Sequence, residues 1–200
     1  IRKIHYLAYY IEDHLLHFFF LAAPDFILGP ATPAESRNIL GLINRIGLET
    51  GKKILDVRKK TREIIKMIAG NASHPEGGLP GGVTISLKDE DRRFIKEVSI
   101  EAIKLSIFAL NLFKDLILKN KKYMDLILSE TYSLKTHYMG LVDDNKKMCF
   151  YDGKIRIVNS DGKEIALFDP HYYHTYIGEC VEPWTYIRLT HLSQHFVAKH

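Results

Sequence analysis

Ten histidines are the side chains of this sequence best suited to hold a metal ion, and six of them form three pairs at helical spacing. The pairs are His14 with His17, His171 with His174, and His191 with His195. Zinc requires three or four converging ligands, and a metalloprotease helix places Glu directly after its first His, where this chain has Leu192. The favoured interpretation is partly buried or surface histidines that satisfy their ring nitrogens locally.

The two cysteines, Cys149 and Cys180, form no CxxC pair. One disulfide between them is possible, but two cysteines in a chain of this size are no disulfide framework, so a reducing cytoplasm is expected. A nucleophilic cysteine needs a nearby base and an electropositive setting, and the favoured interpretation is a small buried apolar residue. The sequence also lacks a Walker loop, a GxGxxG turn and a GxSxG elbow.

Residues 70–82 form a different kind of candidate, with five glycines and two prolines in thirteen positions. Such a segment cannot form regular structure. Glycine lets the backbone approach another body closely, and loops of this kind carry function when a rigid scaffold positions them. His74 stands at the centre of the segment and is the histidine singled out by position. The alternative is a packed structural turn.

Composition limits the classes of protein to consider. The chain has 200 residues, 46% of them hydrophobic, which suits one domain or a main domain with a small appendage. The net charge of +4 is a mild excess, and the short basic clusters at 58–60 and 119–122 indicate solvated faces rather than a nucleic-acid patch. The apolar run 15–28 contains His17, Pro24 and Asp25 and is too short to span a membrane. The first residue is not Met, which indicates processing or a piece of a longer chain, and no secretory signal peptide is evident.

Most of the chain has helical periodicity. Pro24 is expected to stop the first helix, Thr32 to Glu35 to start the second, and Ser86 with Asp89 to cap the fourth. The fourth helix has an apolar arc so broad that burial on more than one side is expected. The predicted helices are 1–22, 32–46, 51–69, 88–118 and 122–130.

The period then changes to that of strands. Segments 148–151, 155–158 and 165–168, separated by two Asp-Gly pairs, predict a three-stranded meander. Asp169 and Pro170 are expected to cap a short helix at 171–178. The predicted fold is therefore mainly α, a bundle of long helices with a small antiparallel β-meander near 146–168. We expect parts 1–145, 146–168 and 169–200 to pack as one domain.

The glycine-rich loop resembles the central motif of nickel–iron hydrogenase large (alpha) subunits, which has Gly, three variable residues, His-Pro, about four more residues and Pro-Gly-Gly. The matching residues are Gly70, His74, Pro75, Pro80, Gly81 and Gly82. Asn71 stands where the family often has Arg. Further segments are similar to the family in the same order along the chain, at 13–25, 38–43, 136–142, 151–156, 176–179 and 181–186. The last of these, Glu-Pro-Trp-Thr-Tyr in its core, favours the cytoplasmic, cofactor-linked hydrogenases, including the methyl-viologen-reducing type of archaea.

The resemblance also shows what this segment lacks. The family holds nickel and iron through four cysteine thiolates in two CxxC motifs, one near each end of the full chain, and thiolates suit a redox metal. Neither motif is present here, nor are the family's later Pro-Arg-Gly and Asp-Pro-Cys elements, and Arg188 replaces a frequent Lys. The chain is thus expected to contain no complete catalytic set and no metal ligand. By itself it should bind no cofactor and be inactive.

By resemblance, the full-length parent is a hydrogenase that interconverts H2 with protons and electrons at a nickel–iron centre. Its expected partner is a small subunit carrying iron–sulfur clusters, with no nucleic acid and no membrane span. The resemblance places His74 near that subunit interface, in an electron-transfer environment, and gives Glu179 a supporting role around the active site. The alternatives are a non-catalytic helical scaffold and a metal-free relative like the complex I subunit. A central piece would expose apolar faces, so self-association is expected.

Overall fold

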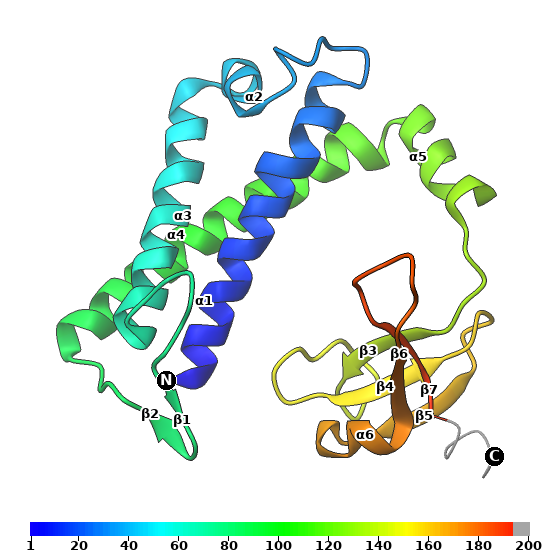
Figure 1. Ribbon diagram of the computed structural model, residues 1–200. Coiled ribbons are helices and arrows are strands. Elements are labelled where there is room, and N and C mark those ends of the chain that lie inside the picture. The colour runs from blue at the N-terminus through cyan, green and yellow to red at the C-terminus, as the bar shows by residue number, and fades with distance from the viewer. Residues whose placement is uncertain (194–200) are drawn as a thin grey trace. The chain divides into compact units, whose positions relative to one another are not determined.

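The computed structural model describes residues 1–193 (for Tyr132, the backbone only), and these divide into two compact units (Figure 1). The N-terminal unit is Ile1–Thr131 and the C-terminal unit is Tyr132–His200. The mainly helical fold with small antiparallel sheets confirms the predicted fold class. The observed boundary lies earlier than the predicted one at 145. That the parts pack as one domain stays a prediction.

The N-terminal unit begins with a helix longer than the sequence predicted. α1 (Arg2–Leu15) continues in π-helical form through η1 (Leu16–Ala22) and η2 (Pro24–Leu28). The prediction that Pro24 stops this helix is wrong. Proline occupies the first position of η2, where its missing N–H is tolerated, and the helix ends at Gly29, whose φ is +92°.

The next two helices begin at different residues from those predicted. α2 (Ile39–Ile46) is capped by Asn38, whose Oδ1 accepts hydrogen bonds from the backbone N–H groups of the second and third helical residues at 2.9 and 3.1 Å. The prediction of a helix start at 32–35 is wrong, because that stretch forms turns. α3 (Leu48–Ala69) starts three residues before the predicted position, after Gly47 at φ +94°.

A glycine-rich loop with a small hairpin, β1 (Gly78–Leu79) and β2 (Gly82–Val83), follows α3. The prediction that residues 70–82 form no regular structure is therefore wrong for the end of the segment, because the Pro80–Gly81 turn lets two short strands pair. The long helix α4 (Asp89–Phe113) then continues through η3 (Lys114–Leu118), which confirms the predicted helix at 88–118. Its cap differs from the predicted Ser86–Asp89 pair, because the backbone N–H of Lys88 donates to Asp91 Oδ2 at 2.8 Å. The last helix of the unit is α5 (Lys121–Leu128), and the short η4 (Glu130–Tyr132) lies at the boundary between the two units.

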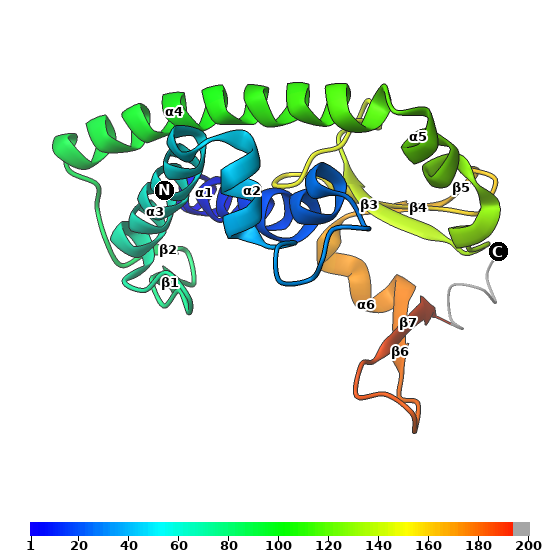
Figure 2. The ribbon, with the colours of Figure 1, turned by 90° about the horizontal axis from the view of Figure 1, so that it is seen from above.

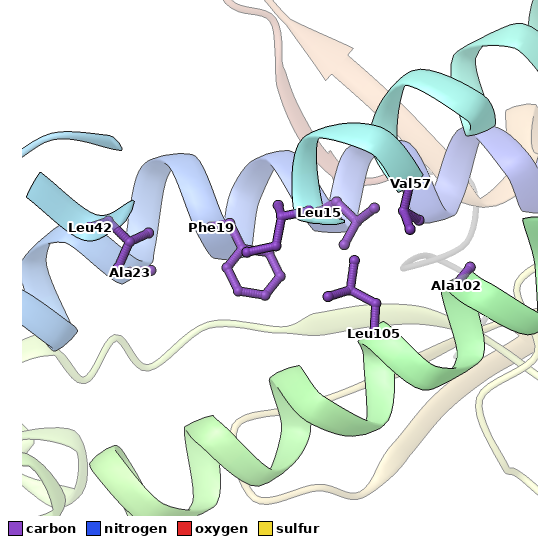
Figure 3. Packing of buried hydrophobic residues seen from close by; sticks show 8 residues of the cluster. Leu15, Phe19, Ala23, Leu42, Val57, Ala102 and Leu105 are labelled. Carbon is purple, nitrogen blue, oxygen red and sulfur yellow. The ribbon is translucent and has the colours of Figure 1, made fainter. Parts of the chain in front are cut away.

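The core of this unit lies between the long helices. α4 runs along one side of the layer that α1, α2 and α3 form (Figure 2). Its buried residues Ala102 and Leu105 face Leu15, Phe19 and Val57 (Figure 3). The remaining members of this cluster are Ala23, Leu42 and Ile54. A second cluster consists of Ala8, Ile64, Ile65, Ile68 and Val98.

The prediction that α4 is buried on more than one side is not met within this unit. Ile103, Ile107 and Leu110 are each more than half exposed, although the opposite face of the helix is in the core. An apolar stripe of this kind is unusual on a free surface. In the part of the chain that the structure describes, no helix is long and apolar enough to cross a membrane.

The C-terminal unit is built on a three-stranded antiparallel sheet in the order β3–β4–β5. Its strands are β3 (Tyr138–Val142), β4 (Lys154–Val158) and β5 (Glu164–Phe168). The meander was predicted correctly except for its first strand, which was placed at 148–151. That segment forms only an isolated bridge of Met148 opposite Val142, beside which the Cys149 N–H donates to Leu141 O at 3.0 Å. The chain turns after Asp143, whose Oδ1 accepts from two backbone N–H groups at 2.9 Å, and the apolar residues 148–151 belong to the return loop.

A second, two-stranded sheet completes this unit. Asp169 caps η5 (Pro170–Tyr172), as predicted, by accepting a 2.9 Å hydrogen bond from the His171 backbone N–H. The predicted helix at 171–178 ends earlier, because α6 (Tyr173–Tyr176) is followed directly by β6 (Ile177–Cys180), which pairs with β7 (Leu189–Leu192). The Phe168 and Tyr176 rings stack at 3.9 Å between centroids over the small core of Ile157 and Ala166.

Candidate functional site

The glycine-rich loop is folded against the end of α3 by backbone hydrogen bonds. Gly70 ends the helix at φ +77°, a conformation that favours glycine, and its N–H donates to Lys66 O at 2.8 Å. The chain then returns, and Glu76 N–H donates to Ala69 O at 3.1 Å. At the buried Gly77 a Cβ would lie 2.7 Å from Ile68 O, which no real contact allows. The return of the loop therefore requires glycine at this position.

The small hairpin is held by the start of α1, beside which Figure 1 places it. Its turn contains Pro80 and Gly81, and Gly81 has φ +84°, as position three of a type II turn requires. Arg2 Nη2 donates to Leu79 O at 2.7 Å, and Arg2 Nε donates to Gly82 O at 3.3 Å. The charged guanidinium of Arg2 donates to two backbone carbonyls of the hairpin, and these hydrogen bonds fix the hairpin to the first turn of α1.

A buried ionic cluster holds the other side of the loop. Glu12 of α1 is 7% exposed, and its Oε1 lies 2.6 Å from Arg58 Nη2 and 3.3 Å from Arg62 Nη1. Arg62 Nη2 also donates to Ser73 Oγ at 3.3 Å. The cluster therefore ties α1, α3 and the loop together. Sequence analysis missed this cluster. The position of Glu12 between Ala8 and Leu15, on the apolar face of the first helix, could have indicated a buried carboxylate.

The predicted loop residues lie together, and His74 lies in their midst. Gly70, Pro75, Pro80, Gly81 and Gly82 all belong to the segment that α1 and α3 hold. The His74 side chain is exposed and has no hydrogen-bond or ion-pair partner among the described residues. A fixed backbone thus presents a free imidazole at the surface of the N-terminal unit.

Glu179, the second predicted site residue, lies on β6 in the C-terminal unit. Its Oε2 accepts a hydrogen bond from Arg188 Nη1 at 3.3 Å, and both side chains are exposed. The neighbouring Gly178 is covered by the ring of His191, because a Cβ there would lie 2.6 Å from His191 Nε2. Glu179 is therefore a carboxylate already paired with an arginine, on a hairpin separate from the His74 loop.

The described residues do not provide a metal centre. They contain no group of three or more His, Cys, Asp or Glu side chains placed to share an ion. An iron–sulfur cluster requires four protein ligands, usually thiolates, and this chain has only two cysteines, both free. The Nδ1 atoms of His14 and His17 contact backbone oxygens one turn earlier, at 2.8 Å, as predicted for locally satisfied histidines, whereas His5 Nε2 is buried without a partner among the described residues. His195 lies outside the described residues. Within residues 1–193, therefore, the side chains form neither a nickel–iron nor an iron–sulfur site.

Comparison with known proteins supplies the wider context. No family model matches the chain. It is 36% identical over 195 residues to the iron-sulfur subunit of the F420-non-reducing hydrogenase of Archaeoglobus profundus, covering 97% of this chain and 40% of that protein. It is 37% identical over 188 residues to a vhu-type subunit of the F420-non-reducing hydrogenase of Methanocaldococcus jannaschii, covering 94% of this chain and 44% of that protein. The chain is homologous to hydrogenase subunits.

A solved structure agrees with the sequence comparison. The chain superposes with a TM-score of 0.84 and 27% identity on a crystal structure titled NAD+-reducing [NiFe]-hydrogenase in the H2-reduced state, covering 96% of this chain and 42% of that one. The chain thus spans about two fifths of the length of the hydrogenase subunits that it matches. The resemblance to hydrogenases that the sequence motifs indicated is therefore supported over nearly the whole length of this chain.

The same comparison corrects the predicted subunit type. The relatives that cover nearly the whole chain include one named as an iron-sulfur subunit and, at 29% identity in Cupriavidus necator, the NAD-reducing hydrogenase HoxS subunit beta. The assignment to the large (alpha) subunit is contradicted by these names, and the similarity is to the iron-sulfur or beta type of subunit. Motif matching within this segment indicated similarity to hydrogenase subunits but not which type of subunit carries the motifs.

Proposed function

We propose that this chain is part of a hydrogenase subunit, in an enzyme that interconverts H2 with two protons and two electrons. The observation that carries the proposal is the similarity to hydrogenase subunits along 94–97% of the chain. Within that enzyme the chain acts as a framework, because its described residues bring no set of metal ligands together. The nickel–iron centre and the iron–sulfur clusters would be held by sequence beyond this segment and by other subunits, at a cytoplasmic location.

The proposed contribution of the N-terminal unit is the loop that carries His74. Arg2 and Arg62 hold the loop from two helices, so the imidazole is presented on a fixed backbone. A neutral imidazole donates a hydrogen bond from one ring nitrogen and accepts one at the other, which suits it to the polar surroundings of an electron carrier in a neighbouring subunit. His74 would thus assist electron transfer between subunits without binding a metal.

The proposed contribution of the C-terminal unit is the carboxylate of Glu179. Its pairing with Arg188 fixes one oxygen, which leaves the other free to order water or a neighbouring group in the assembled enzyme. Such a residue supports a centre through hydrogen bonds to its ligands rather than by binding the metal directly. The role applies only in the complete protein, since this hairpin is exposed here.

A non-catalytic relative is the second candidate, and the residues of this segment are compatible with both candidates. The described residues contain no group of three or more His, Cys, Asp or Glu side chains placed to share an ion, which is expected both of a scaffold without metals and of a segment whose metal ligands lie elsewhere in the protein. Nickel content separates the two candidates. A hydrogenase assembled from this chain, its flanking sequence and its partner subunits would contain nickel, and a metal-free relative would not.

The experiment is substitution of His74 by Ala in the complete, metal-loaded enzyme, followed by H2-dependent reduction of a viologen dye and by nickel analysis. We expect slower electron transfer to the dye and an unchanged nickel content, because the imidazole is no ligand. Loss of nickel would contradict the proposed role. The matched control is His171→Ala, at an exposed histidine that contacts Asp169. It should leave both the rate of viologen reduction and the nickel content unchanged.

A further inference from the structure

A basic groove lies along α3, on the side where the glycine-rich loop begins. It encloses about 300 Å³, and its walls include Arg58, Lys59, Arg62 and Lys66, with Leu55 and Ala72 at its edges. Three of these cations, at positions 58, 62 and 66, follow one another at intervals of four residues. Four residues of α-helix rise about 6 Å, so the three charges form a row with nearly one charge per turn.

The groove carries more positive charge than its own carboxylates neutralise. Glu63 lies 4.0 Å from Lys59 at its nearest approach, and Lys66 has no ion-pair partner among the described residues. Four cations against the two carboxylates of Glu12 and Glu63 leave an excess of two positive charges. An open groove with unbalanced charge of one sign attracts a ligand of the opposite sign.

Two of the cations are held in place before any ligand arrives. The buried carboxylate of Glu12 fixes both arginines, and the Arg58 guanidinium also lies 5.3 Å from the centre of the Phe20 ring. Arg58 Nε remains without an acceptor among the described residues. Fixed side chains lose little conformational entropy on binding, which makes these guanidinium groups effective parts of a recognition surface.

We propose that this groove docks an acidic helix of a protein partner, with carboxylates spaced four residues apart. Glutamates at positions i, i+4 and i+8 of such a helix rise by the same 6 Å per step as the three cations of α3. The groove is open, and its cations follow one another along α3 instead of surrounding one point, which favours a row of side chains over a single small anion. The inference depends only on the geometry of α3 and not on the proposed hydrogenase function.

The test measures binding of a synthetic probe to the 200-residue chain. The probe is an alanine-rich, fluorophore-labelled peptide with Glu at every fourth position, and its counterpart carries Gln at the same positions. Fluorescence anisotropy would be recorded for the wild type, for Lys66→Gln and for Lys96→Gln. Lys96 is an exposed lysine of α4 outside the groove, so its variant has the same charge change and serves as the control. Circular dichroism melts verify that each variant is folded.

The proposal predicts that the Glu peptide binds, that the Gln peptide does not, and that Lys66→Gln weakens binding about two- to fivefold. Lys96→Gln should leave the affinity unchanged, and raising the salt concentration should weaken binding by screening the charges. Failure of the Glu peptide to bind, or equal weakening by both variants, would overturn the proposal. Competition by inorganic phosphate at the concentration at which the peptide binds would also overturn it, since the groove would then bind small anions.

Discussion

Replacing Glu12 with glutamine removes the one carboxylate that Arg58 and Arg62 share inside the N-terminal unit. In the wild type both guanidinium groups lie within 3.3 Å of Glu12 Oε1, which is nearly inaccessible to water. Glutamine has the same shape and can still accept one hydrogen bond from an arginine, but it carries no charge. The variant therefore tests the ionic interaction with little change in packing.

The expected loss of stability follows from the burial of the three groups. Removing one member of a fully buried ion pair costs about 3–5 kcal/mol. The arginine side chains are 25% and 37% exposed, so water screens them, and the amide retains one hydrogen bond. We expect the free energy of unfolding to fall by about 2 kcal/mol, a value between the costs of breaking a fully buried ion pair and an exposed one. For a unit of this size that lowers the melting temperature by roughly 6–10 °C.

The assay is thermal and urea unfolding followed by circular dichroism, with Glu63→Gln as the control. Glu63 is exposed, and its contact with Lys59 is long, at 4.0 Å. Its replacement should therefore change the free energy of unfolding by less than about 0.5 kcal/mol. Because Arg62 also holds Ser73, hydrogen exchange of the loop amides 71–76 should increase in Glu12→Gln and not in the control. Equal stability of the two variants would refute the reasoning that Glu12 anchors the loop.

Three further predictions concern single residues. Gly77→Ala should destabilise the N-terminal unit by about 1–3 kcal/mol in urea unfolding, because its Cβ would meet Ile68 O at 2.7 Å, whereas Gly78→Ala, with open space around it, should cost far less. Equal costs would contradict the close approach. Lys146 and Arg156 hold the pKa of Glu164 below its ordinary value of 4.5, so this carboxylate stabilises the fold above about pH 4.5 and loses that effect as pH falls through its lowered pKa. Urea midpoints measured between about pH 3 and 6 should depend less on pH in Glu164→Gln, and an unchanged dependence would contradict this. Trp184, the only tryptophan of the chain, is 74% exposed, so acrylamide should quench its fluorescence as efficiently as it quenches free indole, and a protected indole would contradict the exposed hairpin loop.

Helical periodicity predicted most of the long elements, because the inward residues of α3 and α4 repeat without interruption. Ile54, Val57 and Ile64 are all buried, as their spacing indicated. Local capping signals were less reliable. Thr32 to Glu35 match the pattern of a helix start, yet Asn38 caps α2, because a single side-chain pattern cannot outweigh the packing that fixes the following helix.

The candidate site was only partly predictable, since its support comes from residues far apart in sequence. The glycines and prolines identified the loop, and His74 was found by its central position. The contacts of Glu12 with Arg58 and Arg62, and of Arg2 with the hairpin, join segments 46 to 80 residues apart, which no local pattern indicates. The exposed stripe of α4 is the converse case. Its apolar residues were identified, but their periodicity did not indicate that one side of the helix is exposed in this unit.

The most direct test of the account is nickel analysis and H2-dependent viologen reduction by the complex that contains this chain, its flanking sequence and its partner subunits. The account predicts that the complex contains nickel and reduces the dye with H2, and that the 200-residue chain alone contains no nickel and has no activity. A fully assembled complex without nickel and without H2-dependent activity would contradict it, and the chain would then be the scaffold of a metal-free relative.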